Sequence, residues 1–415
     1  MMKKILILSN NPVSTTSSNG RTMLNMLHEF KQEQLFNIFV SGTIDSSYCN
    51  YYQINDRDAL KSFFGFRNIG HIPDLQHVSK NLGTIKNKKT SLKVFIRNVV
   101  WNNSRVKKII KAKAKEFAPD VILIQVGDCS FMIKIALYLQ ETLNIPIVVY
   151  NSEDYYFKTW NYIEPIKKGG LFFGKVQKDY KKIFEILMSK SFASIYLTDD
   201  LKALYDSSFN QCRSFVIYNS AFSPKDEDKI EIDKSLYIYS GNISVGRDVS
   251  LLRASKVIFD LTSCKLTIYS TDKSLDSIRK LSSCPYINFR GAISYDENIS
   301  LLKKAVLCLH VESFETFYLR DTKHAFSGKI PDSLQSGRPF VFFGPPSTTC
   351  YKYLVENGCG FVSSSEKELA NTIIGILNND NIVETTLKKA RTICSKNHNQ
   401  FANSNLFKSI IDEAN

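Results

Sequence analysis

Short apolar runs alternate along this chain with longer amphipathic stretches, and the alternation restricts which folds are available. The clearest apolar runs cover residues 121–126 and 145–150, and a helix-like segment at 131–143 separates them. A strand, a helix and a second strand of these lengths form a βαβ unit, whose strands lie parallel in one sheet. The 415 residues, 43% of them hydrophobic, exceed the usual size of one domain. We therefore expect an α/β protein with two domains.

One segment, residues 326–339, predicts a short helix between a polar loop and a buried strand. Ser327 is a suitable N-cap residue, Ile330 and Leu334 have helical spacing, and Gly337 stands where a left-handed residue would end the helix. The apolar run at 340–345 follows as the strand.

The chemistry of this segment suits a phosphate ligand. A helix N-terminus offers unpaired backbone N–H groups, and Lys329 adds a full positive charge on the same turn. Asp332, one turn further, is placed to accept sugar hydroxyl groups. An ordinary αβ unit with a solvated Lys329 is equally consistent with these residues taken alone.

The segment resembles the donor-binding motif of retaining glycosyltransferases of family 4, which have the GT-B fold. Asp332 stands at the second acidic position of that motif, and His324 replaces the first glutamate, for which Glu312 and Glu315 are weaker candidates. The resemblance implies donor contacts from Ser327, Gly328, Lys329 and Asp332. It leaves the role of His324 open.

A second part of the resemblance lies upstream, where a strand-like run at 235–240 leads into a glycine-containing loop. Gly241 and, six residues later, Arg247 match the positions that grip the donor diphosphate in the family, and a guanidinium suits two phosphate oxygens. Asn242 stands where the family usually has an arginine. The resemblance also implies that Ile293 contacts the nucleotide base and that Gly20 faces the ligand.

Glu153 is a candidate site residue because of its position after a predicted strand. It follows the predicted strand at 145–150, and ligands of parallel sheets bind at the carboxyl ends of the strands. Its carboxylate would orient the acceptor hydroxyl or the donor sugar. Helix capping is an equally good explanation for an acidic residue here.

The expected architecture is two Rossmann-like domains whose parallel sheets face a central cleft. The predicted boundaries are 1–222 for the acceptor domain, 223–233 for a polar linker, 234–395 for the donor domain, and 396–415 for a C-terminal helix that packs back on the first domain.

Charge is concentrated in one part of the predicted acceptor domain. Residues 80–115 contain twelve Lys or Arg and no Asp or Glu, in a chain whose net charge is +14. From residue 94 onward apolar side chains alternate with these cations, as in a basic amphipathic helix that lies on an anionic membrane. A solvated basic face over a packed apolar stripe is the alternative. No helix-turn-helix, zinc-finger spacing or aromatic platform accompanies the charge, so we do not expect nucleic acid as a partner.

Other features limit the compartment and the chemistry. The nine cysteines are scattered without a C-x-x-C pair, which argues against both a disulfide framework and a zinc site. No apolar stretch has the length of a membrane span, so we expect a cytoplasmic protein, with contact to the inner face of the plasma membrane.

Together these features predict a metal-independent hexosyltransferase that needs no cofactor and uses a nucleoside diphosphate sugar, above all a UDP-sugar. The resemblance to family 4 implies that the anomeric configuration is retained. Arg247, Lys329 and Glu153 are the predicted catalytic residues. The acceptor is a hydroxyl of a glycan or lipid-linked glycan, as in the synthesis of bacterial surface polysaccharides. A nucleotide-sugar epimerase and a catalytically inactive GT-B scaffold remain alternatives.

Overall fold

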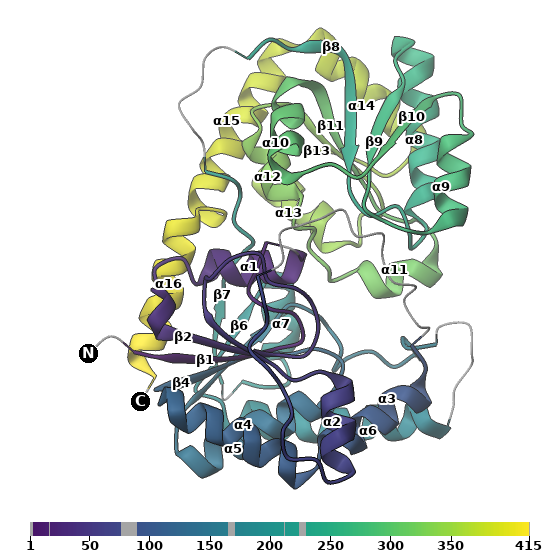
Figure 1. The fold of residues 1–415 in the computed structure, drawn as a ribbon. Coiled ribbons are helices and arrows are strands. Elements are labelled where there is room, and N and C mark those ends of the chain that lie inside the picture. Colours follow the sequence, from purple (N-terminus) through teal and green to yellow (C-terminus); the bar gives the residue numbers. More distant parts are fainter. Residues whose placement is uncertain are drawn as a thin grey trace. The chain divides into compact units, whose positions relative to one another are not determined.

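The computed structural model describes residues 3–15, 17–75, 89–164, 171–210, 212–223 and 230–414 (Figure 1). The chain divides into two compact units. Unit 1 comprises Met1–Tyr218 together with Gln400–Asn415, and unit 2 comprises Asn219–Asn399. Residues 224–229, in the predicted linker, and residues 80–88, at the start of the basic stretch, lie outside the described residues.

Unit 1 is built on a parallel sheet of seven strands in the order β3-β2-β1-β4-β5-β6-β7. In the central strand, Ile5 pairs with Leu35 on one side and Val121 on the other. The central strands are buried on both faces, which explains their continuous apolar runs. The strands are β1 Ile5–Ser9, β2 Leu35–Phe39, β3 Asn50–Gln53, β4 Val121–Gln125, β5 Ile147–Asn151, β6 Ala193–Tyr196 and β7 Arg213–Val216.

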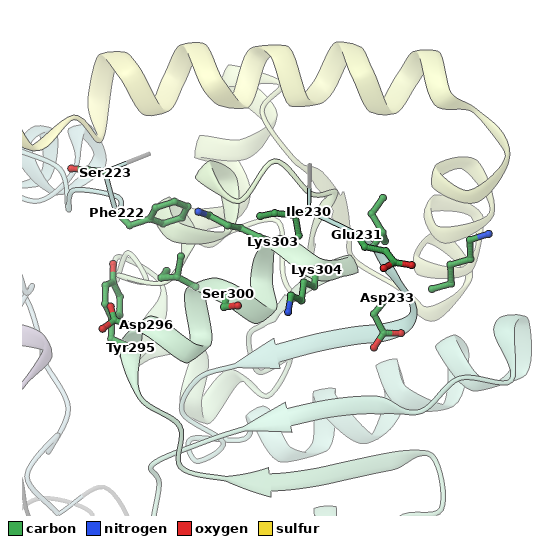
Figure 2. A pocket seen from close by; sticks show the side chains of 13 residues that line it. Phe222, Ser223, Ile230, Glu231, Asp233, Tyr295, Asp296, Ser300, Lys303 and Lys304 are labelled. Atoms are coloured by element: carbon green, nitrogen blue, oxygen red, sulfur yellow. The ribbon is translucent and has the colours of Figure 1, made fainter. Parts of the chain in front are cut away.

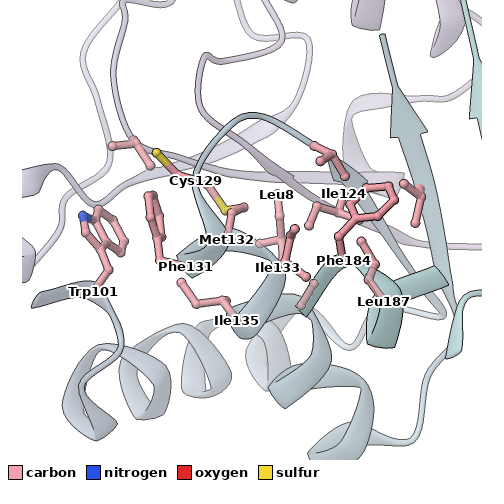
Figure 3. Close-up of a cluster of buried hydrophobic side chains, with 14 of the residues drawn as sticks. Leu8, Trp101, Ile124, Cys129, Phe131, Met132, Ile133, Ile135, Phe184 and Leu187 are labelled. Carbon is pink, nitrogen blue, oxygen red and sulfur yellow. The ribbon is translucent and has the colours of Figure 1, made fainter. Parts of the chain in front are cut away.

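Helices cover both faces of this sheet (Figure 1) and enclose two apolar cores, the larger of which is drawn in Figure 3. In the larger core, Trp101 stacks on Phe131 with ring centroids 4.6 Å apart, and Phe184 and Leu187 of a neighbouring helix are buried in the same cluster. The helices are α1 Ser18–Met26, η1 Gln32–Gln34, α2 Asp56–Phe63, α3 Ser91–Trp101, α4 Ser104–Phe117, α5 Ser130–Leu143, α6 Leu171–Lys190, α7 Asp199–Asp206 and α16 Gln400–Glu413.

Unit 2 is built on a parallel sheet of six strands in the order β10-β9-β8-β11-β12-β13. The strands are β8 Asp233–Ser240, β9 Leu266–Tyr269, β10 Ile287–Gly291, β11 Ala305–Val311, β12 Phe340–Phe343 and β13 Phe361–Ser363. The helices are α8 Arg247–Thr262, α9 Leu275–Ser282, α10 Tyr295–Lys304, α11 Thr316–Thr322, α12 Ile330–Gln335, α13 Thr349–Asn357, α14 Glu366–Asn378 and α15 Asp380–Asn397.

The helix predicted within residues 326–339 is α12, and its start differs from the prediction. The N-cap is Lys329, whereas Ser327 lies two residues earlier in a turn and accepts a weak hydrogen bond of 3.4 Å from the Lys329 N–H. Pro331 in the first turn favours this start, because its fixed φ suits the first helical positions. Gly337 has φ +73° and follows the C-cap, as the sequence predicted.

The apolar side chains of the basic stretch are mostly part of the unit 1 core. Val94, Trp101, Val106 and Ile110 are all buried, and they come from α3 and α4. For this stripe the packed alternative therefore holds, because side chains that fill a core cannot also enter a membrane. The lysines of α4 lie around the buried stripe as a solvated face.

Each sheet has one topological switch point, where the strand order turns from one direction along the sheet to the other. In unit 1 it lies between β1 and β4, and in unit 2 between β8 and β11. Loops leave the carboxyl ends of these two strands in opposite directions, which opens a crevice in which ligands of such sheets bind. Residues at these two places are the natural candidates for a functional site.

Candidate functional site

At the unit 2 switch point, the loop from β8 to α8 is tightly built. Gly241 follows β8, and a Cβ at this position would lie 2.7 Å from the Tyr239 hydroxyl oxygen. That hydroxyl donates a hydrogen bond of 2.5 Å to the carbonyl of Asn242. The glycine predicted from the motif is therefore required by the close approach of a buried tyrosine.

Two consecutive residues of this loop have left-handed backbone conformations. Val245 has φ +54° and Gly246 has φ +76°. A β-branched residue rarely adopts positive φ, and such strain is common at ligand-binding positions. A Cβ at Gly246 would overlap both Ser313 Oγ and the ring of Tyr318, so only glycine fits at the N-cap of α8. The loop is thereby fixed close to the end of β11.

Arg247, the first residue of α8, forms an ion pair with Glu312, which directly follows β11. Arg247 Nη2 lies 2.7 Å from Glu312 Oε1, and both side chains are largely buried. His310, the second-last residue of β11, places Nε2 3.4 Å from the same oxygen. The two strands of the switch point thus bring a guanidinium, a carboxylate and an imidazole together.

The charges of this cluster determine its protonation. Burial would raise the pKa of Glu312, but the hydrogen bond from His310 and the positive charge of Arg247 outweigh it, so the pKa is lowered. Burial lowers the pKa of His310, with Glu312 opposing and the charges of Arg247 and Lys329 adding to the effect. The cluster at neutral pH is therefore an ionised Arg–Glu pair beside a neutral imidazole.

Two polar atoms of this cluster have no hydrogen-bond partner within the described residues. They are Nε of Arg247 and Oε2 of Glu312. A buried polar atom without a partner costs about 1–3 kcal/mol, so proteins retain it where a ligand or water completes the bonding. Nε of Arg247 can donate to a phosphate oxygen, and Oε2 of Glu312 can accept from a hydroxyl group. The two atoms therefore suit a ligand that carries both kinds of group.

Lys329 and Ser327 also belong to this neighbourhood. The positive charge of Lys329 adds to the burial that lowers the pKa of His310. Burial raises the pKa of the Cys350 thiol, and the charge of Glu312 adds to this shift. A hydrogen bond with the Ser327 backbone and the charge of Arg247 oppose it. Lys329 itself is exposed, as is Gly328. The two motifs found in the sequence therefore converge on one end of the sheet.

Asp332 lies in the first turn of α12, and its side chain is hydrogen-bonded to other groups of the protein. It is buried, and its Oδ1 accepts hydrogen bonds from the backbone N–H of Phe222 at 2.9 Å and from the Tyr295 hydroxyl at 3.0 Å. These contacts tie the first residues of unit 2 to α10 and α12. The predicted bond from Asp332 to a sugar hydroxyl stays a prediction.

At the unit 1 switch point there is a cavity of about 200 Å³. It is lined by residues that follow β1, β4 and β5, by Lys89 before α3 and by Arg97 within α3. This is the position expected for a ligand of this sheet. The lining includes Glu153, the acidic residue predicted for this edge. Its polar lining also includes Asn10, Asn11, Asn19, Arg97, Gln125 and Asp128.

Both cations that line this cavity are paired with carboxylates, and amide side chains make up much of its other polar lining. Arg97 bonds to Asp56 at 2.7 Å and to Asn10 at 3.3 Å, and Lys89 pairs with Asp128. Three asparagines and a glutamine supply amide donors and acceptors. Paired cations, a carboxylate and amides suit a neutral ligand with many hydroxyl groups better than an anion.

Two further predicted residues are explained mainly by packing. Gly20 is buried in α1, where a Cβ would lie 2.5 Å from the carbonyl oxygens of Pro12 and Ser14. Its neighbour Asn19 is the residue that lines the cavity. Ile293 is half-buried, two residues after β10. The ligand contacts expected of Gly20 and Ile293 stay predictions.

A larger cavity of about 1040 Å³ lies elsewhere in unit 2 (Figure 2). It runs along α10 toward the first residues of β8, and Figure 2 shows Lys303, Lys304 and Asp233 among its side chains. Because the first residues of β8 are at the amino end of the strand, this cavity reaches the edge of the sheet opposite the switch point. We do not assign the chemistry to it.

Neither a metal centre nor a membrane-spanning helix is present among the residues that the structure describes. Within the described ranges, no group of three or more His, Cys, Asp or Glu side chains is arranged to hold a metal ion. In the same part of the chain, no helix is both long and apolar enough to cross a membrane.

The structure adds residues that the sequence motifs do not mark. Glu312 was a minor candidate and proves to be the partner of Arg247, and His310 was not recognised. A His-x-Glu pair at the end of a buried strand is the signal that would have indicated both. Arg97 and Asp128 were also missed, because they reach the unit 1 cavity from segments far apart in the sequence.

Comparison with known proteins identifies the fold. No protein-family model and no curated protein matches the sequence. Sucrose-phosphate synthase from Thermosynechococcus elongatus matches with a TM-score of 0.67 at 10% identity over 99% of both chains. Alr3699/HepE from Anabaena, in complex with UDP, matches with a TM-score of 0.66 at 12% identity over 99% of both chains. A Listeria monocytogenes protein assigned as a UDP-N-acetylglucosamine 2-epimerase matches with a TM-score of 0.57 at 12% identity, over 99% of this chain and 98% of the other. The chain has the GT-B fold of two Rossmann-like domains, as predicted.

Proposed function

We propose that the protein is a glycosyltransferase that moves a hexose from a nucleoside diphosphate sugar, above all a UDP-sugar, to a hydroxyl of a glycan or lipid-linked glycan. The observation that carries the proposal is the buried Arg247–Glu312–His310 cluster at the unit 2 switch point, with unused hydrogen-bonding capacity on Arg247 and Glu312. The fold supports it, since the fold relatives include Alr3699/HepE, solved with UDP and with UDP-glucose.

In this proposal unit 2 binds the donor. Arg247 and Lys329 stabilise the negative charge that grows on the departing diphosphate, which is electrostatic catalysis directed at the transition state. Arg247 keeps its Nε for a phosphate oxygen, while the pair with Glu312 holds the guanidinium in place. Because two cations serve the leaving group, the reaction needs no metal ion.

Unit 1 binds the acceptor in its switch-point cavity. The amides of Asn10, Asn11 and Gln125 bond to sugar hydroxyl groups, and Glu153 orients the hydroxyl that attacks. Retention of the anomeric configuration follows the resemblance to family 4. The synthesis of bacterial surface polysaccharides, in the cytoplasm and next to the inner face of the plasma membrane, is the proposed setting.

The epimerase alternative is favoured by one observation, the fold similarity to the Listeria protein. An epimerase converts its sugar nucleotide without an acceptor. Incubating the protein with UDP-sugars alone separates the two functions, because a transferase returns the donor unchanged or slowly hydrolysed, whereas an epimerase yields a second sugar nucleotide. A chain that binds nucleotide but converts no donor with any acceptor is an inactive scaffold.

The decisive experiment is calorimetric titration with UDP, GDP and ADP of the wild type, of Lys329→Ala and of Lys367→Ala. Lys367 is an exposed lysine of α14 in the same unit, so its variant is the matched control. We expect UDP to bind most tightly, with weaker binding only in Lys329→Ala. Equal binding by all three proteins would remove Lys329 from the donor site, and absence of binding by any nucleotide would overturn the proposed function.

A further inference from the structure

An apolar face on unit 1 remains exposed after the core has formed. It consists of seven side chains from α2, the turn that follows it, and α3, here called the α2–α3 face: Leu60, Phe63, Phe64, Phe66, Leu92, Ile96 and Val99. Phe64 and Phe66 are 72% and 63% exposed. Among the described residues, most other exposed large apolar side chains are scattered over residues 230–406.

The two helices that carry this face are neighbours. α2 packs against α3, as Figure 1 shows, and Asp56 at the start of α2 bonds to both Arg97 and Trp101 of α3 at 2.7 Å. On α3, Leu92, Ile96 and Val99 follow one another at spacings of four and three, so they share one side of the helix. The inward side of α3 is filled by Val94 and Trp101.

Cations surround this face. Residues 56–75 and 89–105, which include α2 and α3, contain seven Lys or Arg and three Asp. Arg57, Lys61, Arg67, Lys93 and Arg105 are all exposed. Exposed aromatic and aliphatic side chains within a basic rim match an anionic bilayer, which accepts the apolar side chains between its headgroups and attracts the cations. A second copy of this chain fits worse, because two such faces would repel each other.

We propose that the α2–α3 face docks on the surface of an anionic membrane. The protein lies on the bilayer and does not cross it, with Phe64 and Phe66 as the main apolar anchors. The same helix that carries Leu92, Ile96 and Val99 also supplies Arg97 to the unit 1 cavity. α3 therefore carries part of the docking face and also a residue of the cavity lining, which suits a lipid-linked molecule. Docking does not depend on the proposed chemistry, and its test uses no activity.

The test is flotation of the full-length protein with vesicles. Vesicles of phosphatidylcholine are compared with vesicles in which a third of the lipid is phosphatidylglycerol. The double variant Phe64→Ser/Phe66→Ser removes two anchors, and Leu275→Ser/Val355→Ser is the control, since those two apolar side chains are 69% and 53% exposed on unit 2. All four positions are exposed, so the thermal unfolding temperature reports whether each variant folds as the wild type does.

We expect the wild type and the control variant to float with anionic vesicles and not with neutral ones, and 0.5 M salt to release them. The Phe64/Phe66 variant should bind at least about tenfold more weakly. Replacing Lys61 and Arg67 by Ala should weaken binding by roughly a similar factor. Equal flotation of the wild type and the Phe64/Phe66 variant overturns the proposal. The proposal is also overturned if the wild type does not bind anionic vesicles. This holds whether the wild type is a monomer or forms a dimer that the Phe64/Phe66 variant does not form.

Discussion

Nη2 of Arg247 lies 2.7 Å from Oε1 of Glu312, and this ion pair joins the first turn of α8 to the end of β11. The two residues are far apart in the sequence, and each stands at the carboxyl end of a strand beside the switch point. The pair fixes the one guanidinium that both the loop geometry and the donor motif single out.

The ion pair should couple the two side chains energetically. Glu312→Gln leaves a buried guanidinium without its counter-ion, so it should lower the free energy of unfolding by about 3 kcal/mol. Arg247→Met alone should have a comparable effect. The double variant should lose less than the sum of the two, by about 1–3 kcal/mol, in a double-mutant cycle from urea unfolding. Additive losses would show that the pair does not interact.

Lys329 should matter for chemistry and not for folding. Because its side chain is exposed, Lys329→Ala should unfold at the wild-type temperature, while turnover with the nucleotide sugar falls by about a hundredfold. Lys329→Arg should recover part of the rate, since the charge is kept. Steady-state kinetics of both variants beside Lys367→Ala provides the measurement, and wild-type turnover in Lys329→Ala would contradict the leaving-group role.

Glu153 should affect the acceptor and leave the donor unaffected. It lines the unit 1 cavity, whereas the donor residues belong to unit 2. Glu153→Gln should therefore raise KM for the acceptor or lower kcat, and the affinity for UDP measured by calorimetry should remain that of the wild type. Weaker UDP binding in this variant would place Glu153 at the donor instead.

His398 should make the protein sensitive to acid. Burial lowers its pKa to about 4, although the hydrogen bond to the Asn219 carbonyl opposes the shift. The unfolded chain takes up this proton near pH 6.5, so the stability from a neutral His398 is complete above that pH and is lost as pH falls toward 4. The loss should reach about 3 kcal/mol. It should be smaller in His398→Gln, as urea unfolding between pH 7 and 4 will show; equal pH dependence would exclude His398.

Replacing each of two glycines of unit 2 by alanine should change the stability of the protein in opposite directions. Gly337 has φ +73° and Gly375 lies inside α14, and a Cβ added at either position would meet no heavy atom within 4 Å, so packing does not distinguish them. Gly337→Ala should destabilise by about 1–2 kcal/mol because of its left-handed backbone. Gly375→Ala should stabilise by about 0.5–1 kcal/mol. Thermal unfolding of the two variants checks both signs, and destabilisation by both would contradict the conformational explanation.

Local patterns in the sequence predicted much of the fold. The runs at 121–126, 145–150 and 340–345 overlap β4, β5 and β12, and the segment at 131–143 lies in α5. Buried parallel strands are recognisable because both faces need apolar side chains, and helices because one face does. The helix start near Ser327 was predicted less well. Cap geometry depends on the turn at 327–330, which propensity does not determine.

The candidate site was predictable only in part, for a related reason. Gly241, Arg247 and Lys329 lie in local motifs, and spacing along the chain was sufficient to select them. Glu312 and His310 have no motif of their own. Their importance follows from the strand order, which places the end of β11 beside the end of β8 although more than sixty residues separate them.

The sequence by itself determined the class of fold, because hydrophobic periodicity and turn residues act over a few residues and dictate where strands and helices form. Tertiary structure decided which side chains serve the site and which serve the core. The apolar side chains Val94, Val106 and Ile110 of the basic stretch are buried in the core, whereas Phe64 and Phe66 are exposed. Burial and charge pairing depend on residues brought together from distant parts of the chain, and their energies are therefore set only when the sheets assemble.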